Sequence, residues 1–290
     1  MISKSDSKKN KFRFEKGDLR FAVIGHNEWI NFLEVDKLPK PGIISHSKRN
    51  MELPAGGGSV IAKTLLELTK GEVHFFTSLG DDYYGKQSHK ILENIGLKLH
   101  VAWRNKPTRK GFSLIDAKGE RSITIVGERL EPEFKDNLEW DILSQMDGIF
   151  ITAGDQKLFT IARKSKILCA TPRVGINIIN NSRVIIDALI GSNLDPGENY
   201  KLSDLILKPK YIIKTEGEKG GVIIPGGRFS AYKSQNKIDS YGCGDSFAAG
   251  IIYGLASGWS IEKVLTLGKV LGRNCVEHFG PYPDLKAVLS

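Results

Sequence analysis

The chain has 290 residues, of which 40% are hydrophobic and 26% charged, and it contains 31 glycines against 11 prolines. This composition is typical of a globular protein with a buried core, and it excludes a disordered or collagen-like chain. No apolar stretch approaches the roughly 20 residues that a membrane span needs, and no apolar segment follows the polar N-terminus as in a secretion signal. We therefore expect a cytoplasmic protein without membrane contact.

The formal net charge of +9 permits nucleic-acid binding, but the basic residues are spread along the chain and form no stripe with interleaved aromatic residues. We expect a basic, solvated surface and no nucleic-acid partner, although part of the charge could attract a phosphorylated small molecule. The cysteines Cys169, Cys243 and Cys275 have neither the even number of a disulfide framework nor the paired spacing of a zinc site. We expect them to be reduced thiols.

The first predicted strand, 20–25, is a continuous apolar run closed by glycine, which is typical of a parallel strand buried on both faces. Residues 35–54 contain Pro39, Pro41 and a short alternating stretch, and they predict an excursion into a small flap. Three glycines at 56–58 open a helix whose apolar residues recur at helical spacing. Further strands are predicted at 73–79, 97–103, 111–116, 121–126, 148–152, 167–170, 184–187 and 211–214, a hairpin at 221–232, and helices at 85–94, 244–257 and 261–278.

This alternation of strands and helices predicts the α/β class: a three-layer α/β/α domain with a mostly parallel sheet and a small β-strand flap or lid. We expect a flexible polar tail and lead-in over 1–19 and a single domain over 20–290, with lid strands from about 36–54 and 98–128. The apolar strand residues of the lid could cover a site or pair with a second copy in a homodimer.

The segment 239–250 carries the most chemical information. Gly242 and Gly244 precede a predicted helix with Asp245 in its first turn, so free N–H groups and the positive end of the helix dipole converge on one place and predict an anion hole. A carboxylate there can accept a proton from an attacking hydroxyl while the amides stabilise the transferred group, as phosphoryl transfer requires. An ordinary capping aspartate is the alternative for the short Gly-x-Gly-Asp pattern.

The whole segment, DSYGCGDSFAAG, resembles the C-terminal signature of the ribokinase-like (PfkB-type) carbohydrate kinases, Asp-Thr-x-Gly-Ala-Gly-Asp-x-Phe-x-x-Gly. The resemblance implies that Asp245 is the general base and that Gly242, Cys243 and Gly244 form the anion hole. Other landmarks of the family follow in the right order and cover nearly the whole chain. They are Pro41-Gly42, the glycines at 56–58, and Gly80-x-Asp82 with Gly85.

The segment 215–220 matches the family's Thr-x-Gly-x-x-Gly, and the resemblance implies that Thr215, Gly217 and Gly220 bind ATP, with Asn193 nearby. No Walker or Rossmann glycine pattern is present, so a dehydrogenase is a poor alternative. The implied cofactors are ATP and Mg²⁺, and a monovalent cation such as K⁺ is a further candidate. The family's magnesium-ordering motif has no clean match, and its nearest polar groups are Asn193 and Glu198.

The acceptor half departs from the family, because Ile30 stands where its sugar-binding aspartate is expected and Val60 where its asparagine is expected. Glu28 or Asn31 could replace the missing ligand from a shifted register. Trp29 could stack on a sugar or a base, or simply pack in the core, and Arg109 of the flap could close over the acceptor or remain solvated. The further substrate-binding candidates are Gly56, Gly57 and Arg173.

The sequence therefore predicts a kinase that transfers the γ-phosphate of ATP to a hydroxyl of a sugar, a sugar derivative or a nucleoside. The alternatives are a kinase of a vitamin-like alcohol, or a nucleotide- or sugar-binding sensor with reduced catalysis; the retained Asp245 argues against the sensor. We expect plain ribose and fructose to be poor substrates, because the acceptor site lacks the buried carboxylate that grips a polyol.

Overall fold

The computed structural model describes residues 14–286. Residues 1–13, which include most of the expected polar tail, lie outside this part. The rest of the expected tail is anchored in the domain, because Phe14 packs on Tyr253 with ring centroids 5.3 Å apart and the Gly17 N–H donates a 2.7 Å hydrogen bond to the Tyr253 hydroxyl. The expectation of a flexible lead-in was therefore wrong for residues 14–19: a buried aromatic residue fixes this segment.

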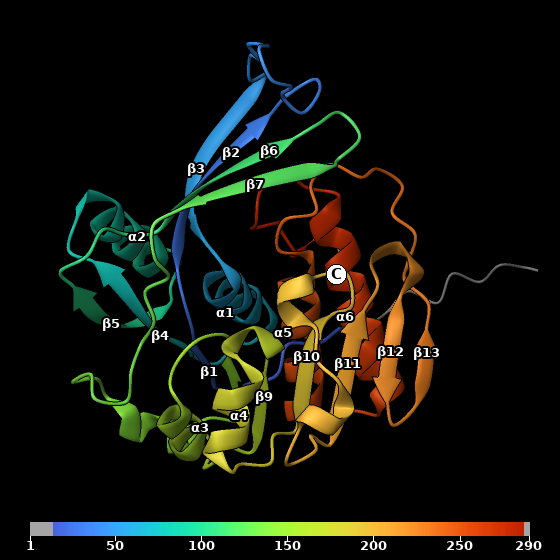
Figure 1. The fold of residues 1–290 in the computed structure, drawn as a ribbon. Coiled ribbons are helices and arrows are strands. Elements are labelled where there is room, and N and C mark those ends of the chain that lie inside the picture. Colours follow the sequence, from blue (N-terminus) through green and yellow to red (C-terminus); the bar gives the residue numbers. More distant parts are fainter. Residues whose placement is uncertain (1–13, 287–290) are drawn as a thin grey trace, which may run out of the picture.

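The main sheet has nine strands and is mostly parallel; only the last two strands of the chain are antiparallel to their neighbours (Figure 1). The sheet confirms the predicted α/β class. In spatial order its strands are β13 (Gly227–Phe229), β12 (Gly221–Ile224), β11 (Tyr211–Thr215), β10 (Ala188–Ser192), β9 (Ile167–Ala170), β8 (Gly148–Ile151), β1 (Phe21–Ile24), β4 (Val73–Gly80) and β5 (Lys98–Arg104).

A separate small sheet projects from one side of the domain and is the candidate lid (Figure 1). Its strands, in spatial order, are β3 (Arg49–Ala55), β2 (Glu28–Glu34), β6 (Lys110–Ile115) and β7 (Arg121–Val126). The expected lid ranges differ from this arrangement at two places. The first lid strand already begins at Glu28, and residues 98–104 form β5 of the main sheet because they pair in parallel with β4.

Helices cover both faces of the main sheet and complete the three predicted layers. Strand residues alternate between the faces: Phe21 and Val23 pack toward one group of helices, and Ala22 and Ile24 toward the other. The first group comprises α1 (Gly57–Leu68), α2 (Tyr83–Asn94), α5 (Cys243–Ala256) and α6 (Ile261–Val276), and the second comprises α3 (Gln156–Ala162) and α4 (Ile176–Ser182). Short 3₁₀ turns lie at Trp140–Gln145, Pro172–Val174, Pro196–Glu198, Leu202–Asp204 and Gly217–Lys219.

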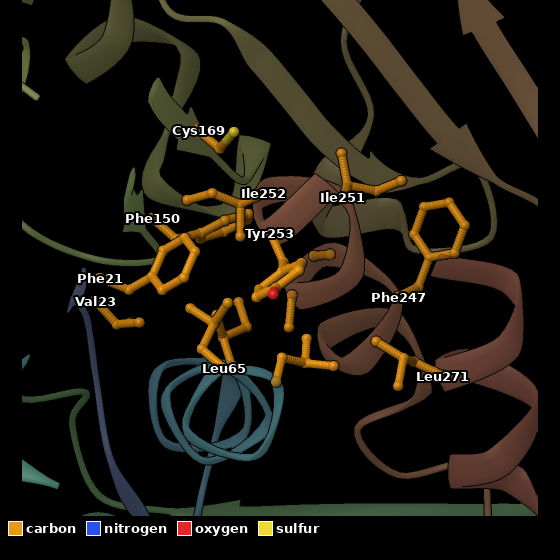
Figure 2. Packing of buried hydrophobic residues seen from close by; sticks show 14 of the residues in the cluster. Phe21, Val23, Leu65, Phe150, Cys169, Phe247, Ile251, Ile252, Tyr253 and Leu271 are labelled. Carbon is orange, nitrogen blue, oxygen red and sulfur yellow. The ribbon is translucent and has the colours of Figure 1, made fainter. Parts of the chain in front are cut away.

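The larger core lies between the sheet and helices α1, α5 and α6 (Figure 2). Phe150 and Leu65 meet the side chains of α5 there, among them Ile252. Helices α5 and α6 approach closely, since a Cβ on Gly250 would lie 2.9 Å from the backbone of Gly268. This packing fixes the position of α5, whose first turn carries Asp245.

One predicted strand was displaced along the chain: residues 184–187 precede β10 rather than form it. Two apolar runs flank Asp187, and pairing with β9 and β11 selects the second, Ala188–Ser192. The buried carboxylate of Asp187 accepts a 2.8 Å hydrogen bond from the Leu168 N–H and pairs with Arg163. The aspartate therefore fixes the entry to the strand. Within residues 14–286, none of the helices is long and apolar enough to cross a membrane.

Candidate active site

Candidate site residues gather at the carboxyl end of β1. Strands β4 and β5 lie on one side of β1, and strands β8 to β11 on the other. In open α/β sheets, ligands bind beyond the carboxyl ends of the strands where the strand order changes direction in this way. Three segments meet there: the turn 25–28 after β1, the start of α1 at 56–57, and the loop 239–245 before α5.

The start of α5 presents free backbone donors. Gly242, with a φ of +77°, turns the chain into the helix, and a Cβ added to Gly244 would meet nothing within 4 Å. The N–H groups of Gly244 and Asp245 donate no hydrogen bond to the residues that the structure describes, whereas the Cys243 N–H makes a long 3.5 Å bond to the Ser240 carbonyl. Such free amides at a helix N-terminus attract an anion.

Two side chains hold this loop in place. Asp239 is fully buried and accepts hydrogen bonds from the N–H groups of Tyr241, at 2.9 Å, and Gly280, at 3.1 Å. The Tyr241 hydroxyl accepts a 3.1 Å hydrogen bond from the Gly56 N–H at the start of α1. The loop before α5 is thereby tied both to the end of the chain and to the other helix N-terminus of the site.

The carboxylate of Asp245 lies against the backbone at the start of α1. A Cβ on Gly57 would stand 2.9 Å from Asp245 Oδ1 and 3.7 Å from His26 Cε1. Asp245 keeps some solvent exposure, but the protein around it removes most of its hydration. This desolvation, followed by the negative charge of Glu198, raises the pKa of Asp245 to about 6. A carboxylate with such a pKa is well matched to accepting a proton near neutral pH.

On the other side of Asp245, a buried histidine and glutamate follow β1. His26 Nε2 lies 3.7 Å from Glu28 Oε1, and Arg109 Nη1 lies 3.3 Å from the same oxygen. Burial, and after it the positive charge of three arginines, lowers the pKa of His26 to about 3, so its ring is neutral at pH 7. Burial also raises the pKa of Glu28, against the opposing charge of Arg109. The three arginines are Arg109, Arg129 and Arg173.

Glu198 lies beyond the carboxyl ends of β9 and β10. Its carboxylate accepts hydrogen bonds from the Ser192 N–H at 2.6 Å, the Thr171 hydroxyl at 3.2 Å and Arg173 Nε at 3.3 Å. Arg173 also pairs with Asp195. The sequence identified Arg173 as a substrate-binding candidate and Glu198 only as a nearby polar group; the structure brings both within electrostatic range of Asp245.

The candidate nucleotide residues lie together at the end of β11. The Asn193 N–H donates a 2.9 Å hydrogen bond to the Thr215 carbonyl, and the Asn193 amide donates a 3.0 Å bond to Glu216. The Thr215 hydroxyl donates a 3.3 Å bond to the carbonyl of Gly191. These contacts order the turn 215–220 against the end of β10.

The two glycines of this turn differ in what surrounds them. Gly217 has a φ of +60°, and a Cβ there would meet only the Leu194 side chain at 3.2 Å. A Cβ on Gly220 would lie 2.0 Å from the Phe229 carbonyl of the neighbouring strand. Gly220 is therefore required by the packing of the hairpin itself, whereas Gly217 leaves its backbone accessible.

The structure does not bring Asn31 to Asp245. Alternating residues of β2 point to opposite faces of the small sheet, so Asn31 shares a face with Trp29 and not with Glu28. The Asn31 amide and the Trp29 indole both donate hydrogen bonds to Glu52 of β3, and the Trp29 ring packs on Tyr84 at 5.6 Å. Asn31 and Trp29 thus contact β3 and α2, on the face of β2 opposite to Glu28.

The two positions that depart from the family pattern are packed in an apolar cluster. Ile30 and Val60 are fully buried, and they cluster with Phe32 and Tyr241 between the small sheet and α1. The aspartate and asparagine expected there are replaced by side chains that join the small sheet to the domain. The polar groups facing Asp245 come instead from His26 and Glu28.

Several of these residues were missed by the sequence analysis. His26 follows a parallel strand directly, and this position was a usable signal because ligands bind at such strand ends. Tyr241 lies inside the recognised motif. No sequence signal pointed to Arg121 or Arg129, since only the fold of the small sheet brings them to the site. The Arg121 guanidinium lies 5.6 Å from the Tyr241 ring centroid.

The chain is similar to known proteins over nearly its whole length. Residues 20–287 match the pfkB family of carbohydrate kinases. Ribokinase from Arabidopsis thaliana is 23% identical over 93% of this chain and 80% of its own length, and a solved structure of Arabidopsis thaliana ribokinase has a TM-score of 0.71 at 21% identity over 94% of this chain and 98% of that chain. A solved adenosine kinase from Sinorhizobium meliloti has a TM-score of 0.74 at 18% identity, with the same coverage.

The chain belongs to the pfkB family of carbohydrate kinases, because the family match spans almost its whole length. The solved structures add that the fold is ribokinase-like. The resemblance derived from the C-terminal motif is thereby confirmed.

The environment of Asp245 gives a testable prediction. Glu198→Gln is expected to lower the pKa of Asp245 from about 6 toward its usual value of 3.8, because the charge of Glu198 disfavours ionisation of a second carboxyl nearby. The measurement is a carboxyl-carbon NMR titration of the protein without nucleotide. Glu218→Gln, at an exposed carboxylate, is the control and is expected to leave this pKa in place. An unchanged or higher pKa in the Glu198 variant would contradict the electrostatic account.

Proposed function

We propose that this protein is an ATP-dependent kinase that phosphorylates a hydroxyl group of a sugar, a sugar derivative or a nucleoside. One observation carries the proposal: within a pfkB-family fold, a carboxylate with a pKa of about 6 lies beside the free N–H groups at the start of α5. The carboxylate suits a general base, and the free N–H groups suit a site for the charge on the transferred phosphoryl group.

The chemistry divides between these groups. Asp245 accepts the proton of the acceptor hydroxyl as the oxygen attacks the γ-phosphorus of ATP, and ADP leaves. The amides of Gly244 and Asp245, with the dipole of α5, stabilise the negative charge on the phosphoryl oxygens. Arg121 and Arg173, whose charges reach Asp245, are positioned to add to this stabilisation.

We place the nucleotide across the turn 215–220. The turn lies at the carboxyl end of a parallel strand, and the backbone of Gly217 is accessible there. The Arabidopsis ribokinase relative was solved in complex with ribose and ATP, which supports two neighbouring small-molecule sites in this fold. The acceptor then lies on the β1 side of Asp245, next to His26 and Glu28.

Magnesium is the cation that such a transfer needs, since the nucleotide phosphates carry several negative charges. No group of three or more histidine, cysteine, aspartate or glutamate side chains suited to a metal gathers within residues 14–286. Mg²⁺ needs only one or two protein carboxylates beside phosphate and water, and Glu198 and Asp195 fit that requirement. These two residues would hold the ion, which would neutralise charge on the nucleotide phosphates.

Removing the proposed base tests the function directly. Asp245→Asn is expected to lower turnover by roughly 10²- to 10⁴-fold, because the amide cannot accept the proton, while ATP affinity stays close to that of the parent protein. In the parent protein, kcat/KM should fall as the pH decreases through about 6, since protonation removes the base. The measurement is ADP release over a panel of sugars, nucleosides and vitamin-like alcohols, together with ATP titration calorimetry.

The matched control is Asp155→Asn, at an aspartate that caps α3 and is expected to leave turnover unchanged. Near-normal turnover in the Asp245 variant would remove this residue from the mechanism. ATP binding without ADP release from any acceptor, in the parent protein, would favour a nucleotide-binding sensor.

The nucleotide placement is tested at Gly217. Gly217→Val is expected to weaken ATP binding by about tenfold or more, because a branched side chain at a φ of +60° distorts the turn and blocks approach of the phosphates. Gly42→Val is the control, since Gly42 has a φ of +78° and open space around it in a distant loop. Equal ATP affinity in the two variants, measured by calorimetry, would show that the nucleotide binds elsewhere.

A further inference from the structure

Three arginine side chains lie on the acceptor side of Asp245, and each has a carboxylate partner: Glu28 for Arg109, Glu131 for Arg129, and Asp195 with Glu198 for Arg173. Three guanidinium groups, those of Arg109, Arg129 and Arg173, lie close enough to influence both His26 and Glu28. Of His26 and Glu28, only Glu28 has a carboxylate, and the ring of His26 is neutral at pH 7.

Arg109 provides an independent sign of a missing partner. Its Nε is buried and has no hydrogen-bond partner among the described residues. The guanidinium makes one ionic contact, with Glu28 at 3.3 Å, and none of its N–H groups donates a hydrogen bond within residues 14–286. A buried donor left unsatisfied costs free energy. His26 Nδ1, on a side chain that is 8% exposed, is likewise without a partner there.

Arg129 extends from the segment after β7 toward the same place. Its Nε pairs with Glu131 at 2.6 Å, and its Nη2 donates a 3.4 Å hydrogen bond to the Arg173 carbonyl. After burial, its charge has the largest influence on the pKa of His26. A forked guanidinium donor matches phosphate and carboxylate groups, which accept two hydrogen bonds side by side, far better than it matches hydroxyl groups.

The phosphates of ATP are a poor explanation for Arg109 and Arg129. The proposed nucleotide turn follows β11, and the acceptor residues follow β1, which lies four strands away in the sheet, or about 19 Å at the usual strand spacing. Arg173 follows β9 and lies between the two, so it is the arginine that the transferred phosphate would meet. The other two are left for the acceptor.

We propose that the acceptor is an anionic alcohol, a hydroxylated small molecule carrying a phosphate or a carboxylate group, and that Arg109 and Arg129 bind this group on the β1 side of Asp245. The inference rests on the proposed kinase function. His26 and Glu28 then bind hydroxyl groups of the same molecule and help to orient the one that is phosphorylated. The absence of the family's sugar-binding aspartate at Ile30 agrees with this, since a carboxylate there would add negative charge to the site.

The test uses acceptors in matched pairs: ribose with ribose 5-phosphate, fructose with fructose 6-phosphate, and glucose with gluconate. Binding is measured by calorimetry in the presence of a non-hydrolysable ATP analogue, and turnover by ADP release. We expect at least one charged compound to bind about 100-fold more tightly than its neutral partner. Comparison of the phosphate-bearing acceptors with the carboxylate-bearing acceptor then shows which anion the site prefers.

Arg109→Gln and Arg129→Gln should each weaken binding of the charged compound by about 10- to 100-fold, the loss expected for a charge-assisted hydrogen bond, and leave the neutral compound nearly unaffected. Arg109→Lys keeps the charge and is expected to have a smaller effect. Arg49→Gln is the control, because Arg49 also lies on the small sheet, over the ring of Phe279 at 4.5 Å, and does not influence His26 or Glu28.

Neutral acceptors that bind as well as their charged partners, or a charge preference that survives in both glutamine variants, would overturn the anion site. ADP release with neutral acceptors alone would also overturn the anion site, but it would leave the proposed kinase function intact. Conversely, arginine-dependent binding of a charged acceptor without ADP release from any compound would support the anion site and contradict the kinase function.

Discussion

The site depends on the close approach of the Asp245 carboxylate to the backbone at the start of α1. No side chain fits between them, because a Cβ on Gly57 would stand 2.9 Å from Asp245 Oδ1. This contact joins two helix N-termini at the carboxyl end of β1, where burial, and after it the negative charge of Glu198, raises the pKa of Asp245 to about 6. The packing of α5 on α6 and the hydrogen bonds of Asp239 hold the helix in the required position.

Charged pairs lie on both sides of this contact. On the β9–β10 side, the two carboxylates of Glu198 and Asp195 pair with the single guanidinium of Arg173, and we propose that they hold the magnesium ion of the nucleotide. On the β1 side, Arg109 pairs with Glu28 beside a neutral histidine, and Arg129 pairs with Glu131. The proposed transfer runs from the first side to the second, where the buried Nε of Arg109 has no hydrogen-bond partner among the described residues.

The parts of the proposed phosphoryl-transfer half are contiguous in the sequence, so short motifs were enough to propose them. Asp245 and its glycines lie in one segment, and so do Thr215 and Gly217. The fold class also followed from the alternation of buried strands and helices. The proposed acceptor half is assembled from separate segments. The sequence named Arg109 as a flap residue that could close over the acceptor, but Arg129 reaches His26 only through the pairing of β2 with β6 and of β6 with β7. The alternatives Glu28 and Asn31 could not be separated from the sequence, because a shift by one residue along a strand reverses the face of the sheet.

The measurement that tests the account most directly is the turnover of Gly57→Ala, at a position whose backbone φ suits alanine. The added methyl group would displace only the mobile end of the Asp245 side chain, so fold and ATP affinity should be retained while turnover falls by roughly 10²-fold through loss of alignment. Gly272→Ala, with contacts of 3.5 Å or more, is the helix-glycine control and should retain activity. Full turnover in the Gly57 variant would contradict the account, because the position of the Asp245 carboxylate against α1 would then not matter.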